Sequence, residues 1–110
     1  MDNKEEKISN QIKELAAKFI QRESNGLSLI TITNSQVSKD GKYVTILFTV
    51  LPEDKESDAL DFTKRKRSEF RDFVKSELRL GRIPTFDFEI DYGEKHRQKI
   101  DKISIESNKA

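Results

Sequence analysis

The segment from Leu29 to Pro52 constrains the fold of this chain more than any other part of its sequence. Its first half, residues 29–37, begins with isoleucine alternating with threonine, and β-branched residues favour the pleated surface of a strand. In its second half, residues 43–51, one face at period two is formed by Val44, Ile46, Phe48 and Val50. The pair Asp40-Gly41 lies between the halves and is a turn signal. The segment therefore predicts a β-hairpin that ends at Pro52.

Apolar residues at helical spacing precede the hairpin. Spacings of three or four residues separate Ile8, Ile12, Leu15 and Phe19, so these side chains share one face of a helix predicted over residues 5–24. The pair Asn25-Gly26 follows, and both residue types tolerate the left-handed conformation that ends helices.

A second helical region is predicted over residues 58–80, after an acidic connector at residues 53–57. Its apolar stripe consists of Ala59, Phe62, Phe70, Phe73 and Val74. At ~100° per residue, the stripe should also pass through position 66, which is a lysine. This interruption predicts a kink or two separate helices, and Gly81 and Pro84 close the region.

A third strand is predicted over residues 85–91, with Phe86, Phe88 and Ile90 on one face. The order helix, strand, strand, helix, strand predicts an α+β fold, a three-stranded sheet with the helices packed on one face and the other face solvated. The 110 residues suffice for one domain, and a hydrophobic content of 34% means a small core. We expect a single domain over residues 1–92 and a polar, flexible tail over residues 93–110.

Composition narrows the class of protein. The chain has no cysteine, which excludes disulfides and thiol chemistry. No apolar run approaches the ~20 residues that span a bilayer, and the N-terminus is too polar for a signal peptide. We therefore expect a cytoplasmic protein with no membrane partner, and the low apolar content favours a monomer.

Positive charge is concentrated in one part of the chain. The net charge is only +1, but residues 64–82 hold eight Lys and Arg against three acidic residues. A local patch of this kind would attract a polyanion even though the net charge is small. On an unbroken helix six of these cations fall within a sector of ~120° opposite Phe73, namely Lys64, Arg67, Arg71, Lys75, Arg79 and Arg82. The candidate RNA-binding residues are these six with Arg65, and with Lys39 and Lys42 at the hairpin corner. The structural alternative is a solvated helix face.

Other groupings are interpreted structurally. Ser38, Lys39 and Asp40 are typical of a turn, because Ser and Asp bond their own backbone at corners. The three carboxylates Asp87, Glu89 and Asp91 are expected to form salt bridges rather than a metal site, and Phe70 and Phe73 are expected to lie in the core rather than stack bases. The only histidine, His96, lies in the polar tail. No nucleophile is paired with a base, so we expect no enzyme, no cofactor, no metal and no small-molecule substrate.

Two blocks of the sequence carry a family resemblance. The first comprises Ile30-Thr31-Ile32-Thr33, Val37-Ser38-Lys39-Asp40 and the strand from Tyr43 to Leu51. The second comprises Phe70-Arg71, Leu78-Arg79-Leu80, Pro84, Phe86, Phe88 and Asp91, and the spacing needs no gap. With these blocks the chain resembles the ribosome-binding factor A family of bacterial small-subunit assembly factors.

The resemblance implies a K-homology-like (type II) domain in which a kinked helix pair replaces the Gly-x-x-Gly loop. The family's Ala-x-Gly at the kink corresponds to Lys66-Arg67-Ser68, and Gly81 stands where the family usually has arginine, beside Arg82. It further implies a non-catalytic factor that binds the immature 30S subunit and its rRNA, and possible contacts with neighbouring ribosomal proteins. The alternative hypothesis is a K-homology-like protein–protein adaptor without direct RNA contact, which the acidic first half of the chain favours.

Overall fold

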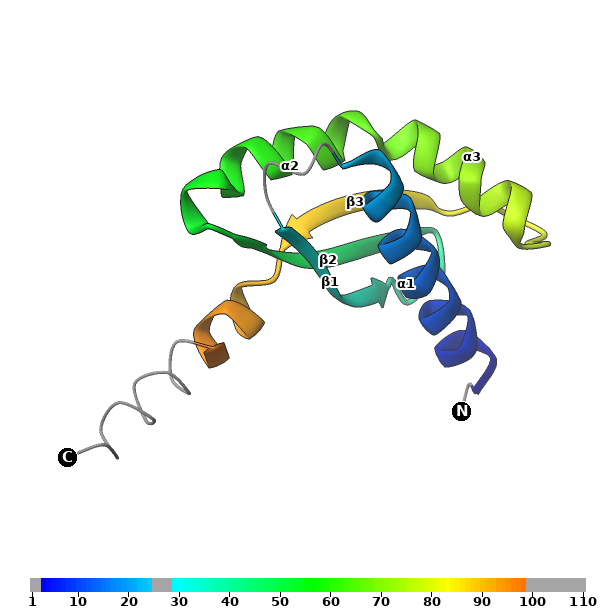
Figure 1. Ribbon diagram of the computed structural model, residues 1–110. Helices are drawn as coiled ribbons and strands as arrows, with labels where there is room; N and C mark the ends of the chain where they lie inside the picture. The colour runs from blue at the N-terminus through cyan, green and yellow to red at the C-terminus, as the bar shows by residue number, and fades with distance from the viewer. Residues whose placement is uncertain (1–2, 25–28, 99–110) are drawn as a thin grey trace.

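The computed structural model describes residues 3–24 and 29–98 (Figure 1). The elements follow the predicted order. They are α1 (Asn3–Glu23), β1 (Leu29–Val37), β2 (Tyr43–Leu51), a 3₁₀ turn η1 (Glu53–Lys55), α2 (Glu56–Arg65), α3 (Arg67–Glu77) and β3 (Thr85–Ile90). The two hairpin strands have the predicted bounds, and the second helical region begins within the predicted acidic connector.

The strands form one sheet in the order β1-β2-β3. The predicted hairpin is confirmed, because β1 pairs antiparallel with β2 from Leu29 opposite Leu51 to Val37 opposite Val44. Strand β3 pairs parallel with β2. The helices α2 and α3 therefore form the crossover that returns the chain to the end of the sheet where β2 begins (Figure 1). The fold is an α+β arrangement of the K-homology-like type, with a mixed three-stranded sheet.

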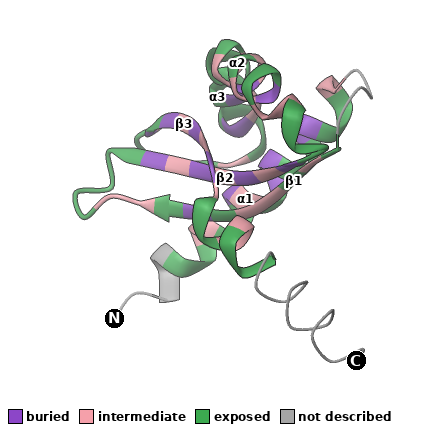
Figure 2. Cartoon of the chain, turned by 90° about the vertical axis from the view of Figure 1, so that its left-hand side faces the viewer, coloured by how far each residue is buried: buried purple, intermediate pink, exposed green. Residues whose placement is uncertain are grey.

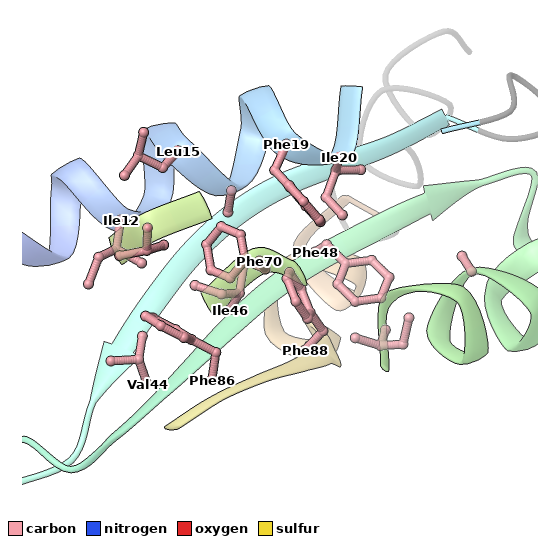
Figure 3. Packing of buried hydrophobic residues seen from close by; sticks show 14 of the residues in the cluster. Ile12, Leu15, Phe19, Ile20, Val44, Ile46, Phe48, Phe70, Phe86 and Phe88 are labelled. Atoms are coloured by element: carbon pink, nitrogen blue, oxygen red, sulfur yellow. The ribbon is translucent and has the colours of Figure 1, made fainter. Parts of the chain in front are cut away.

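The core lies between the helices and one face of the sheet (Figure 3). Phenylalanine rings from both layers meet there, because the ring centroid of Phe70 on α3 lies 5.4 Å from Phe19 on α1 and 5.0 Å from Phe86 on β3. Buried and less buried residues alternate along β2 and β3, as expected for a sheet with one covered face (Figure 2). The expected core role of Phe70 is confirmed, whereas Phe73 is only partly buried.

One core position differs from the prediction. Thr63, not Phe62, is fully buried on α2, and its Oγ1 donates to the backbone oxygen of Leu60. Thr63 lies seven residues before Phe70, which on a helix places it within ~20° of Phe70, whereas Phe62 lies ~80° away. The predicted apolar stripe omits this position because threonine is polar. The hydroxyl of Thr63 is satisfied within its own helix, so its burial leaves no unpaired polar atom.

A β-bulge interrupts β1 between Ile32 and Asn34. The extra residue, Thr33, donates its hydroxyl to the backbone oxygen of Leu47 and to Asp91. A bulge shifts the alternation of faces by one residue, so Ser35 lies on the covered face. There Ser35 Oγ donates to the backbone oxygen of Ser9 at 2.9 Å and its hydroxyl contacts that of Ser9, which ties β1 to α1.

The predicted break in the second helical region is confirmed and falls at Lys66. The backbone nitrogen of Lys66 donates to the oxygen of Thr63, so α2 ends in a tight turn before α3 begins. Lys66 has φ −94° and ψ 4°, which non-glycine residues adopt, so this break does not require the glycine typical of the family. Its ammonium pairs with Glu69 at 3.3 Å and with Glu23 at the end of α1 at 3.7 Å.

Residues 92–98 form a helical segment after β3. Within it, Lys95 Nζ lies 3.1 Å from Glu56 and 3.9 Å from Glu53, so this segment is tied to the start of α2. His96 is exposed there. The predicted flexible tail otherwise falls on residues 99–110, which lie outside the described residues, and the proposed domain boundary near residue 92 stays a prediction.

Candidate nucleic-acid interface

Two of the predicted RNA-binding cations lie against the outward side of β3. Lys64 Nζ lies 3.0 Å from Asp87 Oδ1 and 2.8 Å from Glu89 Oε2. Arg67 donates to Asp87 at 3.3 Å and, through Nε, to the backbone oxygen of Lys64 at 3.0 Å. These contacts confirm the predicted salt bridges of Asp87 and Glu89. Asp91 instead accepts hydrogen bonds from Thr33 and from the backbone nitrogen of Glu94.

The ion pairs shift the proton affinities of their members. Partial burial opposes charge on Lys64, but its hydrogen bonds to Glu89 and Asp87 outweigh that effect and raise its pKa. Partial burial likewise opposes charge on Asp87, but hydrogen bonds from Lys64 and from the backbone nitrogen of Phe88 lower its pKa. The cluster therefore holds α2 and α3 to β3 at the kink, and RNA contacts by Lys64 and Arg67 stay a prediction.

This cluster predicts a pH-dependent contribution to stability. Because the pKa of Asp87 is lowered in the folded protein, its contribution is present above the ordinary value near 3.8 and is lost as the pH falls through the folded pKa. The side chain is 38% exposed, so we expect the Asp87→Asn variant to lose less than ~1 kcal/mol near neutral pH. Urea unfolding at about pH 6 and about pH 3 should show that the difference from the unmodified protein shrinks at the lower pH.

The matched control is Asp61→Asn, because Asp61 is exposed on α2 and has no ion pair among residues 3–24 and 29–98. The control should not show this pH-dependent difference. An Asp87→Asn effect of the same size at both pH values would contradict the role assigned to the carboxylate.

Five other cations of the series are exposed and form no ion pair within the described part of the chain. They are Arg65, Arg71, Lys75, Arg79 and Arg82. On α3, Arg71 and Lys75 each directly follow a buried residue, Phe70 and Val74, and lie one turn apart. Their spacing places both on one side of the helix, free to meet an anion.

The end of α3 corrects the predicted geometry of the series. The helix stops at Glu77, and Leu78 is extended with φ −123° and ψ 140°. Arg79 and Arg82 therefore lie in the loop between α3 and β3 and not on a continuous helix face. Leu78 and Leu80 pack partly against the core, which accounts for the chain leaving the helix early.

The hairpin corner is a turn, as predicted. Ser38 Oγ donates to Asp40 at 2.6 Å, the backbone nitrogen of Lys42 donates to Asp40 at 3.0 Å, and Gly41 adopts φ +72°. The hydrogen bond from Ser38 is the main reason that the pKa of Asp40 is lowered. The side chains of Lys39 and Lys42 are exposed on this turn and form no ion pair among the described residues.

The tertiary structure brings this turn to the loop after α3. The backbone nitrogen of Thr85 donates to the oxygen of Lys42 at 2.9 Å, and Gly41 and Arg82 line one shared cavity. Lys39 and Lys42 thus join the end of the α3 series, a neighbourhood between residues some 40 positions apart that no sequence pattern indicates. We call these exposed residues the basic surface: Arg71, Lys75, Arg79, Arg82, Lys39 and Lys42.

Within residues 3–24 and 29–98, no group of three potential metal ligands is close enough to hold an ion. None of the helices in the described residues is both long and apolar enough to traverse a membrane.

Comparisons with known proteins agree with the fold and the motifs. The family model described as ribosome-binding factor A matches residues 4–104. Ribosome-binding factor A of Staphylococcus carnosus is 31% identical over 104 residues, which cover 89% of this chain and 88% of that protein. The homologue from Fervidobacterium nodosum is 34% identical over 67 residues, which cover 60% of this chain and 54% of that protein.

Solved structures of the same fold also match. The crystal structure of ribosome-binding factor A from Thermus thermophilus aligns with a TM-score of 0.68 and 24% identity, over 76% of this chain and 90% of that one. The NMR structure of a Thermotoga maritima protein described as a putative ribosome-binding factor A gives a TM-score of 0.65 and 22% identity, over 74% of this chain and 81% of that one. A third match is a homology model of the Thermus protein as fitted into a cryo-EM map of its complex with 30S. It gives a TM-score of 0.65 and 24% identity, over 74% of this chain and 88% of that one.

The fold is that of a K-homology-like α+β domain, and its basic surface is a candidate site for binding a polyanion. This chain belongs to the ribosome-binding factor A family.

Proposed function

We propose that this protein is a non-catalytic assembly factor that binds the immature 30S subunit through its rRNA and promotes maturation of that rRNA. The single observation that carries the proposal is the basic surface, whose cations have no ion pair among the described residues. Family membership supports it, as does the Thermus relative that was fitted into a map of a 30S complex. The protein acts in the cytoplasm as a monomer.

The mechanism is electrostatic docking onto a shaped RNA. Each cation that replaces a condensed counterion at a phosphate adds affinity without reading sequence, and RNA shape then selects the site. The ion cluster of Lys64, Arg67, Asp87 and Glu89 fixes α3 relative to β3. It thereby presents Arg71 and Lys75 in a fixed geometry, which lowers the entropy lost on binding.

Salt dependence of small-subunit binding tests this proposal. If four to six cations contact phosphates, the logarithm of the association constant should fall with the logarithm of salt concentration with a slope of about −3 to −5. Co-sedimentation with immature 30S subunits between ~50 and ~300 mM KCl measures that slope. Binding that is independent of salt would contradict phosphate docking.

A protein–protein adaptor is the second candidate, and the outer face of the sheet favours it. Leu29 and Leu51 are paired across β1 and β2 and are 61% and 59% exposed, and Tyr43 on β2 is 58% exposed. Apolar side chains of this size at a surface mark possible protein contacts. An adaptor that docks through them would remain bound at high salt and would lose binding on Leu29→Ser.

A further inference from the structure

A small apolar cavity lies at the end of the molecule where three segments meet. Its volume is about 160 Å³, and it is bounded by the first half of α1, the turn between β1 and β2, and the loop after α3. Its lining includes Ile8, Ile12, Val37, Leu80, Pro84 and Arg82. Figure 3 shows Ile12 and Val44, which also lines the cavity, at the same end of the core.

Most side chains around this cavity are aliphatic, and some of them are only partly covered by the protein. Ile8, Val37 and Leu80 are half-buried, in contrast to the fully covered Ile12 beneath them. The cavity is therefore a surface pocket with an apolar floor. No residue of α2, of α3 or of the break at Lys66 lines it, so it is separate from the place where K-homology domains carry their Gly-x-x-Gly loop.

One cation lines the pocket, and two others are chain neighbours of lining residues. Arg82 is part of its lining, Lys42 directly follows the lining residue Gly41, and Arg79 directly precedes Leu80. None of the three forms an ion pair within residues 3–24 and 29–98. The nearby carboxylate of Asp40 accepts hydrogen bonds from Ser38 and from the backbone of Lys42, so it is engaged within its own turn.

We propose that this pocket holds one unstacked pyrimidine base of the bound RNA while Arg82, Lys42 and Arg79 contact the phosphates on either side. The inference rests on the proposed RNA-binding function and adds a specific contact to it. An apolar interior with an arginine in its lining is complementary to a nucleotide, which has an apolar ring face beside an anionic backbone. An apolar protein side chain would use the floor and leave the cations without partners.

The size of the pocket selects the kind of base. A buried cavity of about 150 Å³ lined by Leu, Ile and Phe holds one benzene molecule, so a pocket of 160 Å³ holds one six-membered ring. Uracil and cytosine are single six-membered rings, whereas adenine and guanine carry a fused second ring. We therefore expect a preference for pyrimidines that electrostatic docking alone would not produce.

The test compares single-stranded oligomers of equal charge. A seven-residue oligouridylate, the same oligomer with all bases removed, and a seven-residue oligoadenylate are titrated into the full-length protein. We expect the abasic oligomer to bind about tenfold more weakly than oligouridylate, and oligoadenylate to lie between them. The methyl NMR signals of Ile8, Val37 and Leu80 should shift with oligouridylate and not with the abasic oligomer.

A pocket-filling variant provides a second measurement. Ile8→Trp should reduce oligouridylate binding to the level of the abasic oligomer and leave abasic binding unchanged. Leu47→Trp is the matched control, because Leu47 is also partly buried but lies on the opposite face of the sheet. The control should retain the difference between the two oligomers.

The outcomes separate this inference from the function on which it rests. Equal binding of oligouridylate and the abasic oligomer would overturn the pyrimidine site and leave phosphate docking intact. If the protein binds neither oligomer and does not bind 30S rRNA, both the pyrimidine site and the proposed RNA-binding function are overturned. A third outcome is that the methyl signals of Ile8, Val37 and Leu80 shift with small-subunit proteins free of RNA and not with oligouridylate. The occupant of the pocket would then be a protein side chain, which would overturn the inference.

Discussion

The double variant Arg71→Glu/Lys75→Glu is expected to bind immature 30S subunits roughly 100-fold more weakly than the unmodified protein at moderate salt. Both side chains are exposed on one side of α3 and form no ion pair in the described part of the chain. Reversal removes two attractive contacts with phosphate and replaces each with repulsion. The salt dependence should also become shallower, by about one unit of slope for each lost cation. Co-sedimentation across a salt series measures both quantities.

The matched control reverses two lysines on another element. Lys13→Glu/Lys18→Glu makes the same change in net charge on α1, at two residues that are not part of the basic surface. We expect this control to lose no more than a few-fold in affinity, through long-range repulsion alone. Equal losses in the two variants would mean that only total charge matters and would contradict a localised interface. Circular dichroism of both variants should be unchanged, since all four positions lie outside the buried core.

The second large effect is on stability. Phe70→Ala is expected to lower the free energy of unfolding by about 3–5 kcal/mol, which is a large share of the total stability of a small domain. Phe70 is fully buried, and its ring centroid lies 5.4 Å from Phe19, 5.0 Å from Phe86 and 5.5 Å from Phe88. Its removal leaves a cavity where both layers of the fold meet. Urea unfolding followed by circular dichroism measures the loss.

Phe73→Ala is the informative comparison, because Phe73 lies on the same helix but is only partly buried. It contacts the ring of Phe19 at 5.7 Å and the guanidinium of Arg22 at 4.9 Å, so its loss should be clearly smaller. A Phe70→Ala loss below that of Phe73→Ala would contradict the placement of Phe70 at the centre of the core.

Local patterns determined the elements and most of the core. Period-two alternation located β1 and β2 with the correct bounds, because the covered face of a sheet favours apolar side chains at alternate positions. The lysine at position 66 revealed the break between α2 and α3, because a charged residue interrupts the stripe that a continuous helix would bury. The same local patterns could not detect the bulge at Thr33, since a bulge is fixed by pairing with β2 and not by residue type.

The candidate site was predicted less completely than the fold. The sequence identified the cations and predicted the break at Lys66, but their shared face was derived for an unbroken helix. The structure displaces residues at both ends of that series. Arg79 and Arg82 left the helix because α3 ends at Glu77. Lys64 and Arg67 turned towards β3 because Asp87 and Glu89 lie beside them.

Local sequence patterns were sufficient to predict the α+β order, the hairpin, the broken crossover helix and the concentration of positive charge over residues 64–82. Which of those charges remain unpaired and exposed depends on the packing of the chain in three dimensions. The parallel pairing of β3 with β2 places two carboxylates against Lys64 and Arg67, and it brings the turn at Lys42 to the loop that carries Arg82. The physical reason is that charge pairing and pocket formation depend on distance in space, whereas a sequence pattern reports only distance along the chain.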